Sequence, residues 1–326
     1  MSKTSAAASI DGSPWLRAWR WLVNDPRAMT ISSEADGLRM DWMRTVPFIA
    51  LHLACLGAVF TGVSPAAVAA AVGSYLLRMF FITAFYHRYF GHRAFRVSRP
   101  MQFVMAVLGC TAGQRGPLWW AGHHREHHAT ADTAADPHSP SHRGMWFSHT
   151  LWFLTRKSFA LPEQRVKDWL RYPELRALER VDWLPFVLYG AGCYALGAWL
   201  GGAHPEMGTS GPQVLVWAFF VSTVFLYHAT YSINSLAHRF GTRRFRTRDD
   251  SRNNLWLALL TLGEGWHNNH HRFPAAARQG FYWWELDISY LVLRVLAAVG
   301  LVSGLRAVPG HVLEDAGTET TEIKPV

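Results

Sequence analysis

The sequence predicts an all-α integral membrane protein with four transmembrane helices, arranged as two hairpins. Two observations support this fold class: long apolar segments occur in two closely spaced pairs, and charged residues are scarce. Half of the 326 residues are hydrophobic and 17% are charged, whereas a soluble domain carries about a quarter charged residues. The composition therefore favours a lipid environment.

Four apolar segments approach the length of about 20 residues that a helix needs to cross a bilayer. They are residues 46–63, 66–86, 184–200 and 213–233. The Ser64-Pro65 link between the first two is too short for anything but a hairpin turn. A loop rich in glycine and proline joins the last two, so the four segments form two expected hairpins.

The segments around these spans set the expected domain boundaries. We expect a cytosolic N-terminal segment with a short amphipathic helix at 15–23, a membrane domain, and a polar tail that is disordered from Leu313 onwards. Their ranges are 1–45, 46–305 and 306–326.

Three further apolar segments are harder to place. Residues 101–112 and 145–154 are too short to span a bilayer and are expected to be interfacial or re-entrant helices. Residues 288–305 could span, but Arg294 near their middle makes an interfacial helix an equal alternative.

The distribution of basic residues predicts the orientation. Residues 87–182 contain 14 Lys and Arg, whereas the loop 201–212 contains none. Because cytoplasmic loops of membrane proteins are enriched in Lys and Arg, both termini and every histidine cluster are expected on the cytosolic side. In a bacterium the membrane would be the inner membrane.

Charge and cysteine content exclude other classes. The net charge is +9, but the basic residues lie between apolar segments, which favours a membrane surface or an anionic head group over nucleic acid. The three cysteines, Cys55, Cys110 and Cys193, show no paired spacing. We therefore expect neither a disulfide framework nor a zinc ribbon.

Nine of the 17 histidines fall into clusters. His124, His127 and His128 have the three- and four-residue spacing that places side chains on one helix face, and the group 267, 270 and 271 repeats it. His87 and His92 are five residues apart and differ by about 140° on an ideal helix. They can share a metal only if the helix ends or bends, and Gly91 offers such a break. The clustered histidines are His87, His92, His124, His127, His128, His238, His267, His270 and His271.

The number of histidines favours two metal ions. Neutral imidazole suits Zn, Cu, Fe and Ni, and a structural zinc site uses only four ligands, commonly with cysteine. Nine ligands fit two metals with four or five each, which leaves positions open for oxygen. Acceptors beside the ligands normally orient the rings, and Asp132, Asp136 and Glu264 are placed to do so.

The full pattern resembles the membrane fatty acid desaturases of the Δ9 stearoyl-CoA type. The motifs are His-x4-His, His-x2-His-His, Asn-x3-His and a second His-x2-His-His, within residues 78–305. The resemblance implies a four-span protein with a cytosolic cap that holds two iron ions on the nine histidines. It also implies that Asn234 reaches one iron through water.

The same resemblance implies oxygen-dependent removal of two hydrogens from a saturated acyl chain, which leaves a cis double bond, expected at Δ9. Unactivated C–H bonds resist side-chain acids and bases, so iron and O2 would supply the oxidation and the protein would position the chain. No cytochrome b5-like His-Pro-Gly-Gly segment is present. Electrons are therefore expected from a separate ferredoxin, cytochrome b5 or similar protein with its reductase.

Substrate-binding residues are also implied only by matching family positions. Gln114, Trp120 and Thr230 would shape a bend in an acyl tunnel, and Tyr75 and Met79 would lie near its closed end. Met79 replaces a small residue there, which predicts a shorter tunnel. The expected head-group residues are Arg115, Arg156 and Lys157. The acyl carrier is left open between CoA, acyl carrier protein and glycerolipid.

Two alternatives to a desaturase are retained. One is a fatty acyl hydroxylase of the same di-iron superfamily, because one oxidant can desaturate or transfer oxygen. The other is a metal- or haem-binding membrane protein without catalysis. Among the remaining histidines, His52 and His228 are interpreted as packed polar residues. His123 is excluded as a ligand because it points about 100° from His124 on a helix.

Overall fold

The computed structural model describes residues 13–315, and this part of the chain is helical, with isolated bridges in place of strands. Four helices are long and apolar enough to cross a membrane: Trp42–Thr61, Pro65–Gly91, Trp183–Ala203 and Gly211–His238. They lie within a few residues of the expected spans. The prediction of an all-helical protein with four candidate spans is confirmed. The arrangement as two membrane hairpins stays a prediction.

The four spans are built from several regular segments. They comprise α3 (Trp42–Ala54) and α4 (Gly57–Thr61); α5 (Pro65–Phe80) and the π-helix η2 (Phe81–Gly91); α11 (Trp183–Ala203); and α12 (Gly211–Val214), the π-helix η8 (Leu215–Val221), α13 (Ser222–Ser235) and the 3₁₀ turn η9 (Leu236–His238).

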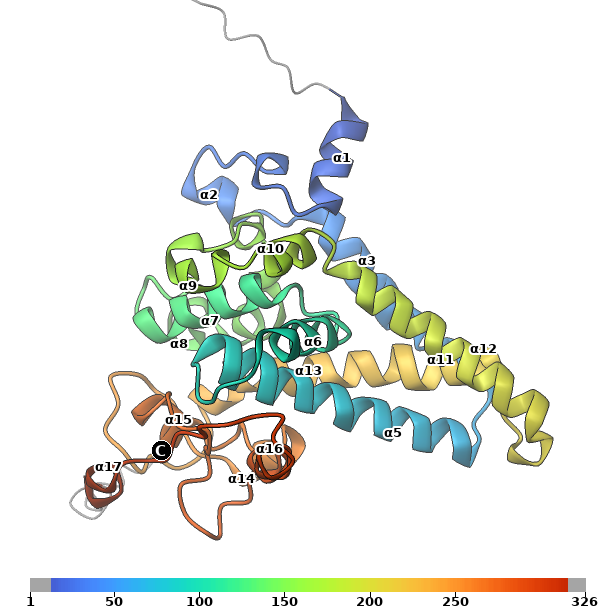
Figure 1. Ribbon diagram of the computed structural model, residues 1–326. Coiled ribbons are helices and arrows are strands. Elements are labelled where there is room, and N and C mark those ends of the chain that lie inside the picture. Colours follow the sequence, from blue (N-terminus) through green and yellow to red (C-terminus); the bar gives the residue numbers. More distant parts are fainter. Residues whose placement is uncertain (1–12, 316–326) are drawn as a thin grey trace, which may run out of the picture.

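Apart from η7, which lies in the turn between α11 and α12, the shorter elements gather at one end of these long helices (Figure 1). The α-helices are α1 (Pro14–Leu22), α2 (Glu34–Gly37), α6 (Arg99–Cys110), α7 (Pro117–Thr130), α8 (Pro140–Arg143), α9 (Lys167–Leu170), α10 (Pro173–Arg180), α14 (Leu255–Leu260), α15 (His267–Arg272), α16 (Ile288–Ala298) and α17 (Gly310–Glu314). The 3₁₀ and π segments are η1 (Pro26–Ala28), η3 (Phe147–Leu151), η4 (Trp152–Leu154), η5 (Lys157–Phe159), η6 (Glu163–Arg165) and η7 (Pro205–Met207).

Several expectations outside the spans need correction. The segment 145–154 is helical, as expected, but most of it consists of the π-helix η3 and the 3₁₀-helix η4 and not of an α-helix. Of the two alternatives for 288–305, the spanning one is wrong, because α16 has only 11 residues and a span needs about 20. The tail is helical at Gly310–Glu314, where disorder was expected from Leu313, and residues 316–326 lie outside the described part.

Arg78 shows how the second and fourth spans are joined. Its guanidinium is fully buried and donates to Thr223 Oγ1 at 2.7 Å and Ser222 Oγ at 2.9 Å. A charged side chain within a span is costly unless neighbouring polar groups satisfy it. Arg78 therefore fastens α5 to α13 from a fully buried position.

Candidate metal centre

The π-helix η2 solves the spacing problem of the first histidine pair. In a π-helix the backbone N–H bonds to the carbonyl five residues earlier, and such segments are frequent at functional sites. The N–H of His92 donates to the carbonyl of His87 at 3.2 Å. Residues five apart therefore lie above one another, and both imidazoles face the same side. The sequence analysis required the helix to bend or end between these two histidines. The structure meets this requirement with a widened helix, the π-helix η2, which ends at Gly91.

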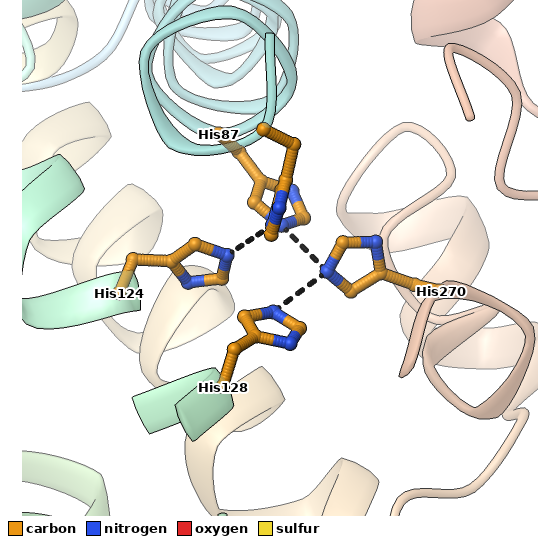
Figure 2. Close-up of side chains that lie close together, drawn as sticks. His87, His124, His128 and His270 are labelled. Atoms are coloured by element: carbon orange, nitrogen blue, oxygen red, sulfur yellow. Dashed lines mark hydrogen bonds between the residues drawn. The ribbon is translucent and has the colours of Figure 1, made fainter. Parts of the chain in front are cut away.

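The nine clustered histidines form two groups, one of five and one of four. Within each group one ring nitrogen from every residue lies within 4.8 Å of all the others. Figure 2 shows four members of the larger group converging from three separate parts of the chain. The five-histidine group is His87, His92, His124, His128 and His270, and the four-histidine group is His127, His238, His267 and His271.

The spacing of the nitrogens suits metal ions. Nε2 of His270 lies 3.0 Å from that of His87 and 2.9 Å from that of His128, and the His238–His267 distance is 3.0 Å. Two nitrogens that bind the same metal ion at about 2.1 Å, with a right angle between the two bonds, are separated by roughly 3 Å. The donor set therefore fits two metal ions, one in each group.

Four carboxylates orient the rings from outside the groups. Nδ1 of His238 donates to Asp132 at 2.7 Å, and Nδ1 of His127 donates to Asp136 at 3.0 Å. Glu264 accepts a hydrogen bond from Nδ1 of His87. Each contact leaves Nε2 as the metal-binding atom and raises its basicity. The three acceptors that the sequence predicted are thus beside clustered histidines.

The fourth carboxylate, Asp249, was missed by the sequence interpretation. It accepts a hydrogen bond from Nδ1 of His271 at 2.8 Å. It lies 22 residues before His271, in a loop whose path depends on tertiary contacts, so no helical spacing connects the two. The only indication in the sequence is that Asp249 stands beside Asp250 in an otherwise arginine-rich stretch.

Burial keeps most of the rings neutral, as metal binding requires. It lowers the pKa of His270, His128 and His92 well below the usual value, with further lowering from neighbouring histidines. It lowers the pKa of His271 to about 4, although Asp249 acts in the opposite direction. His127 differs: burial lowers its pKa, but the carboxylates of Asp136, Asp132 and Asp249 together outweigh burial, so the net shift of the pKa is upward.

Two cavities meet beside the histidines. The larger, of about 290 Å³, runs from Trp21 and Arg44 to His124 and Asn234. The smaller, of about 50 Å³, continues to Met79 and also contacts His87, His127 and His267. Asn234 lines both cavities, which places it next to the histidines, as expected for a residue that reaches a metal through water.

The residues predicted to shape a bend lie at the junction of the cavities. Trp120 and Thr230 line both. Gln114 links them, because its Nε2 donates to Thr230 Oγ1 at 3.1 Å and its Oε1 accepts from Trp120 Nε1 at 3.3 Å. Tyr75 is not among the lining residues of either cavity and instead donates its hydroxyl to the carbonyl of Leu260.

The three expected head-group residues lie in different places. Arg115 lines the larger cavity and pairs with Asp182 at 3.2 Å. Arg156 forms an ion pair with Asp36, and Lys157 is exposed beside it. Neither Arg156 nor Lys157 lines either of the two cavities. Arg44, which the sequence interpretation missed, lines the larger cavity instead.

The histidines left out of the ligand set are held by other contacts. Nε2 of His123 lies 3.2 Å from the carbonyl of Ala160. His52, His228 and His149 form a hydrogen-bonded row with nitrogen distances of 3.1 and 3.0 Å. The interpretation of His52 and His228 as packed polar residues is confirmed.

A comparison with known families identifies the protein class. The family model described as fatty acid desaturase matches residues 64–303, which includes all nine clustered histidines. The chain belongs to the fatty acid desaturase family. This desaturase is an oxidoreductase that acts on fatty acyl chains, and the sequence-based resemblance is confirmed.

Individual relatives agree on desaturation but differ in substrate. The chain is 39% identical over 69% of its length to the probable lipid desaturase ADS3.2 of Arabidopsis thaliana, of which the match covers 59%. It is 36% identical over 80% of its length to the acyl-CoA 5-desaturase AL21 of Anemone leveillei, with 78% of that protein covered. It is 34% identical over 85% of its length to the sn-1 stearoyl-lipid 9-desaturase of Anabaena variabilis, with 98% covered.

Proposed function

We propose that this desaturase introduces a cis Δ9 double bond into saturated acyl chains, with O2 as co-substrate and two iron ions as cofactor. The observation that carries the proposal is the position of the two histidine groups beside the junction of the two cavities. Iron bound there supplies the oxidation that side chains cannot perform. The nine histidines are the proposed ligands, with Asn234 acting through water.

The protein's own contribution is to hold the chain. Gln114 is hydrogen-bonded to both Trp120 and Thr230 at the junction, which fixes the wall where the acyl chain passes the histidines. A chain that enters the larger cavity and ends near Met79 has its middle carbons there. Fixing the reacting carbons in this way lowers the barrier by prior orientation.

We propose that the acyl carrier is a membrane lipid. Arg44 and Arg115 line the larger cavity and are each paired with a carboxylate, Asp41 at 2.8 Å and Asp182 at 3.2 Å. A carrier with several phosphates, such as CoA, favours unpaired guanidinium or ammonium groups. The relative whose length is almost fully covered is named as a lipid desaturase. CoA and acyl carrier protein thioesters are the competing outcomes.

The proposed setting is a membrane with the histidine groups and both termini on the cytosolic side, the inner membrane in a bacterium. The support is the clustering of basic residues in 87–182 and their absence from 201–212. A separate one-electron donor protein with its reductase supplies the electrons.

The test is expression in a host without its own Δ9 desaturase, followed by mapping of double bonds in lipid, CoA and carrier-protein fractions. Oxygen-dependent alkenes at carbon 9, first seen in the lipid fraction, support the proposal. Hydroxy acids would support the hydroxylase instead. His270→Ala is the inactive control, and products identical in both strains would exclude desaturation by this chain. Iron near two per purified chain tests the cofactor.

A further inference from the structure

The loop that follows the fourth span carries an unusual concentration of arginine. Residues 239–252, here called the arginine loop, contain six arginines and two acids. Arg239, Arg243, Arg246 and Arg248 are exposed. Phe240 is also exposed, to 59%, although it lies in a polar segment. This combination of cations around one aromatic side chain is typical of a surface that receives a partner.

The inner side of the arginine loop is fastened to the metal centre. The backbone N–H groups of Arg244 and Phe245 donate to Asn268 Oδ1 at 2.8 and 2.7 Å, and Asn268 follows the histidine at position 267. The N–H of Asp250 donates to Asp132 Oδ2 at 2.8 Å, and Asp132 also accepts from His238. The loop is therefore a preformed cover over the four-histidine group.

The acids of the loop do not cancel its positive charge. Asp249 is turned inwards, to His271. Asp250 accepts from Ser141 at 3.0 Å and lies 3.9 Å from Arg243. Arg244 forms an ion pair with Glu285, which lies outside the loop. The exposed Arg239 and Arg248 have no carboxylate within ion-pair distance among the described residues, so the outer surface of the loop keeps a positive charge.

The arginine loop also contributes the most exposed of the carboxylates that touch clustered histidines. Among the four carboxylates that touch ligand histidines, the side chain of Asp249 is 10% exposed, against 7% for Glu264, 4% for Asp132 and 0% for Asp136. Asp249 belongs to the loop itself. One hydrogen bond therefore connects the loop, through Asp249, to His271.

We infer that the arginine loop is the docking surface for an acidic, one-electron carrier protein. The inference rests on the proposed function, because conversion of CH2–CH2 with O2 to CH=CH and two water molecules consumes two electrons and two protons. A one-electron carrier is oxidised in each of two encounters. Electrostatic attraction speeds such encounters, and a small interface allows the oxidised carrier to leave.

The experiment measures binding of two acidic probes, a [2Fe–2S] ferredoxin and a soluble cytochrome b5 domain, to the full-length, iron-loaded protein in detergent. The test variant is Arg239→Glu with Arg248→Glu, which leaves Arg243 in place because its guanidinium braces the carbonyls of Thr247 and Asp249. The matched control is Arg171→Glu with Arg176→Glu, two exposed arginines around α10.

We expect the loop variant to raise the Kd of at least one probe about tenfold or more at low salt. The difference in Kd between the loop variant and the wild type should shrink in 0.5 M salt, because salt screens the charges. The milder Arg239→Gln with Arg248→Gln should give an intermediate loss. The control variant should change the Kd less than twofold. Thermal unfolding and iron content should match the wild type in all three variants.

The inference is overturned if the wild type binds neither probe, if the loop variant binds as the wild type does, or if the control variant weakens binding equally. A single turnover driven by dithionite separates this failure from failure of the proposed function. If the wild type desaturates with dithionite but the loop variant binds the probes normally, only the docking surface is wrong. If dithionite yields no alkene, the proposed function itself fails.

Discussion

Two neighbouring residues, His127 and His128, contribute to different histidine groups. Consecutive residues on a helix point about 100° apart, so α7 presents His127 to the four-histidine group and His128, with His124, to the five-histidine group. The remaining ligands converge from other elements. The spacing in the sequence shows that three histidines share a broad face. The spacing does not show which histidine belongs to which group, because this depends on where η2, η9 and α15 pack against α7.

Replacing Asp249 with asparagine tests the orientation of a single ligand. An amide can donate to Nδ1 of His271 and so favour the tautomer whose Nε2 carries the proton, which cannot bind metal. Mutating the hydrogen-bond partner of a metal-binding histidine typically lowers metal affinity or activity about 10–100-fold. We therefore expect Asp249→Asn to lower iron content or desaturation by that factor.

The matched control for this prediction is Asp250→Asn, one residue further on. The side chain of Asp250 contacts Ser141 and Arg243 and no clustered histidine. Iron per chain, measured by mass spectrometry, should remain near the wild-type value in this variant. Equal iron loss in both variants would show that the loop, and not the hydrogen bond to His271, is responsible.

At the scale of elements, helix α6 packs tightly against the π-helix η2. A Cβ at Gly109 would lie 2.0 Å from Cε1 of the Tyr86 ring, which is buried and precedes His87. Inserting atoms into a packed core typically costs about 1–3 kcal/mol. We expect Gly109→Ala to lower the unfolding temperature in detergent and to displace η2.

Gly192→Ala is the control for this packing prediction, since nothing lies within 4 Å of a Cβ at that position in α11. Alanine is favoured over glycine inside a helix by up to about 1 kcal/mol. The unfolding temperature should stay the same or rise. A Gly109→Ala variant as stable as Gly192→Ala would contradict the close contact between α6 and η2.

The start of helix α7 depends on a buried acid. Glu179 accepts hydrogen bonds from the N–H groups of Leu118 and Trp119 at 2.9 and 3.1 Å. Burial, together with repulsion from Asp182, raises the pKa of Glu179 to about 8. A carboxyl whose pKa is higher in the folded state than in the unfolded state stabilises the fold fully below the unfolded value of about 4.5. This contribution is lost as the pH rises through 8.

We therefore expect the unfolding temperature in detergent to fall between pH 5 and pH 9, and Glu179→Gln to reduce this dependence. At pH 9 the variant should be more stable than the wild type, because glutamine cannot ionise and still offers an acceptor to the helix start. Differential scanning fluorimetry across the pH range provides the measurement. If the unfolding temperatures of the wild type and the variant fall in parallel with pH, Glu179 is not the cause of the pH dependence.

For the molecule as a whole, the long apolar segments and the histidine spacings were sufficient to predict four spans and one shared metal centre. The hydrogen-bond register of η2 could not be predicted, because it is a choice between nearly equal backbone patterns that packing decides. Arg156 was misplaced for a related reason. Its partner Asp36 lies 120 residues earlier, and such ion pairs appear only once the N-terminal segment is folded onto the rest.

The final prediction concerns the length of the whole acyl cavity. Met79 is 1% exposed and lines the far end of the smaller cavity, so Met79→Ala should extend it and shift the products towards longer acyl chains. Met105→Ala is the control, because Met105 is fully buried in the same core and lines neither cavity. Both changes remove a buried methionine, which costs about 2–5 kcal/mol. Only Met79→Ala should alter the chain-length profile of the alkenes, measured by gas chromatography and mass spectrometry. An unchanged profile would place the end of the acyl chain elsewhere.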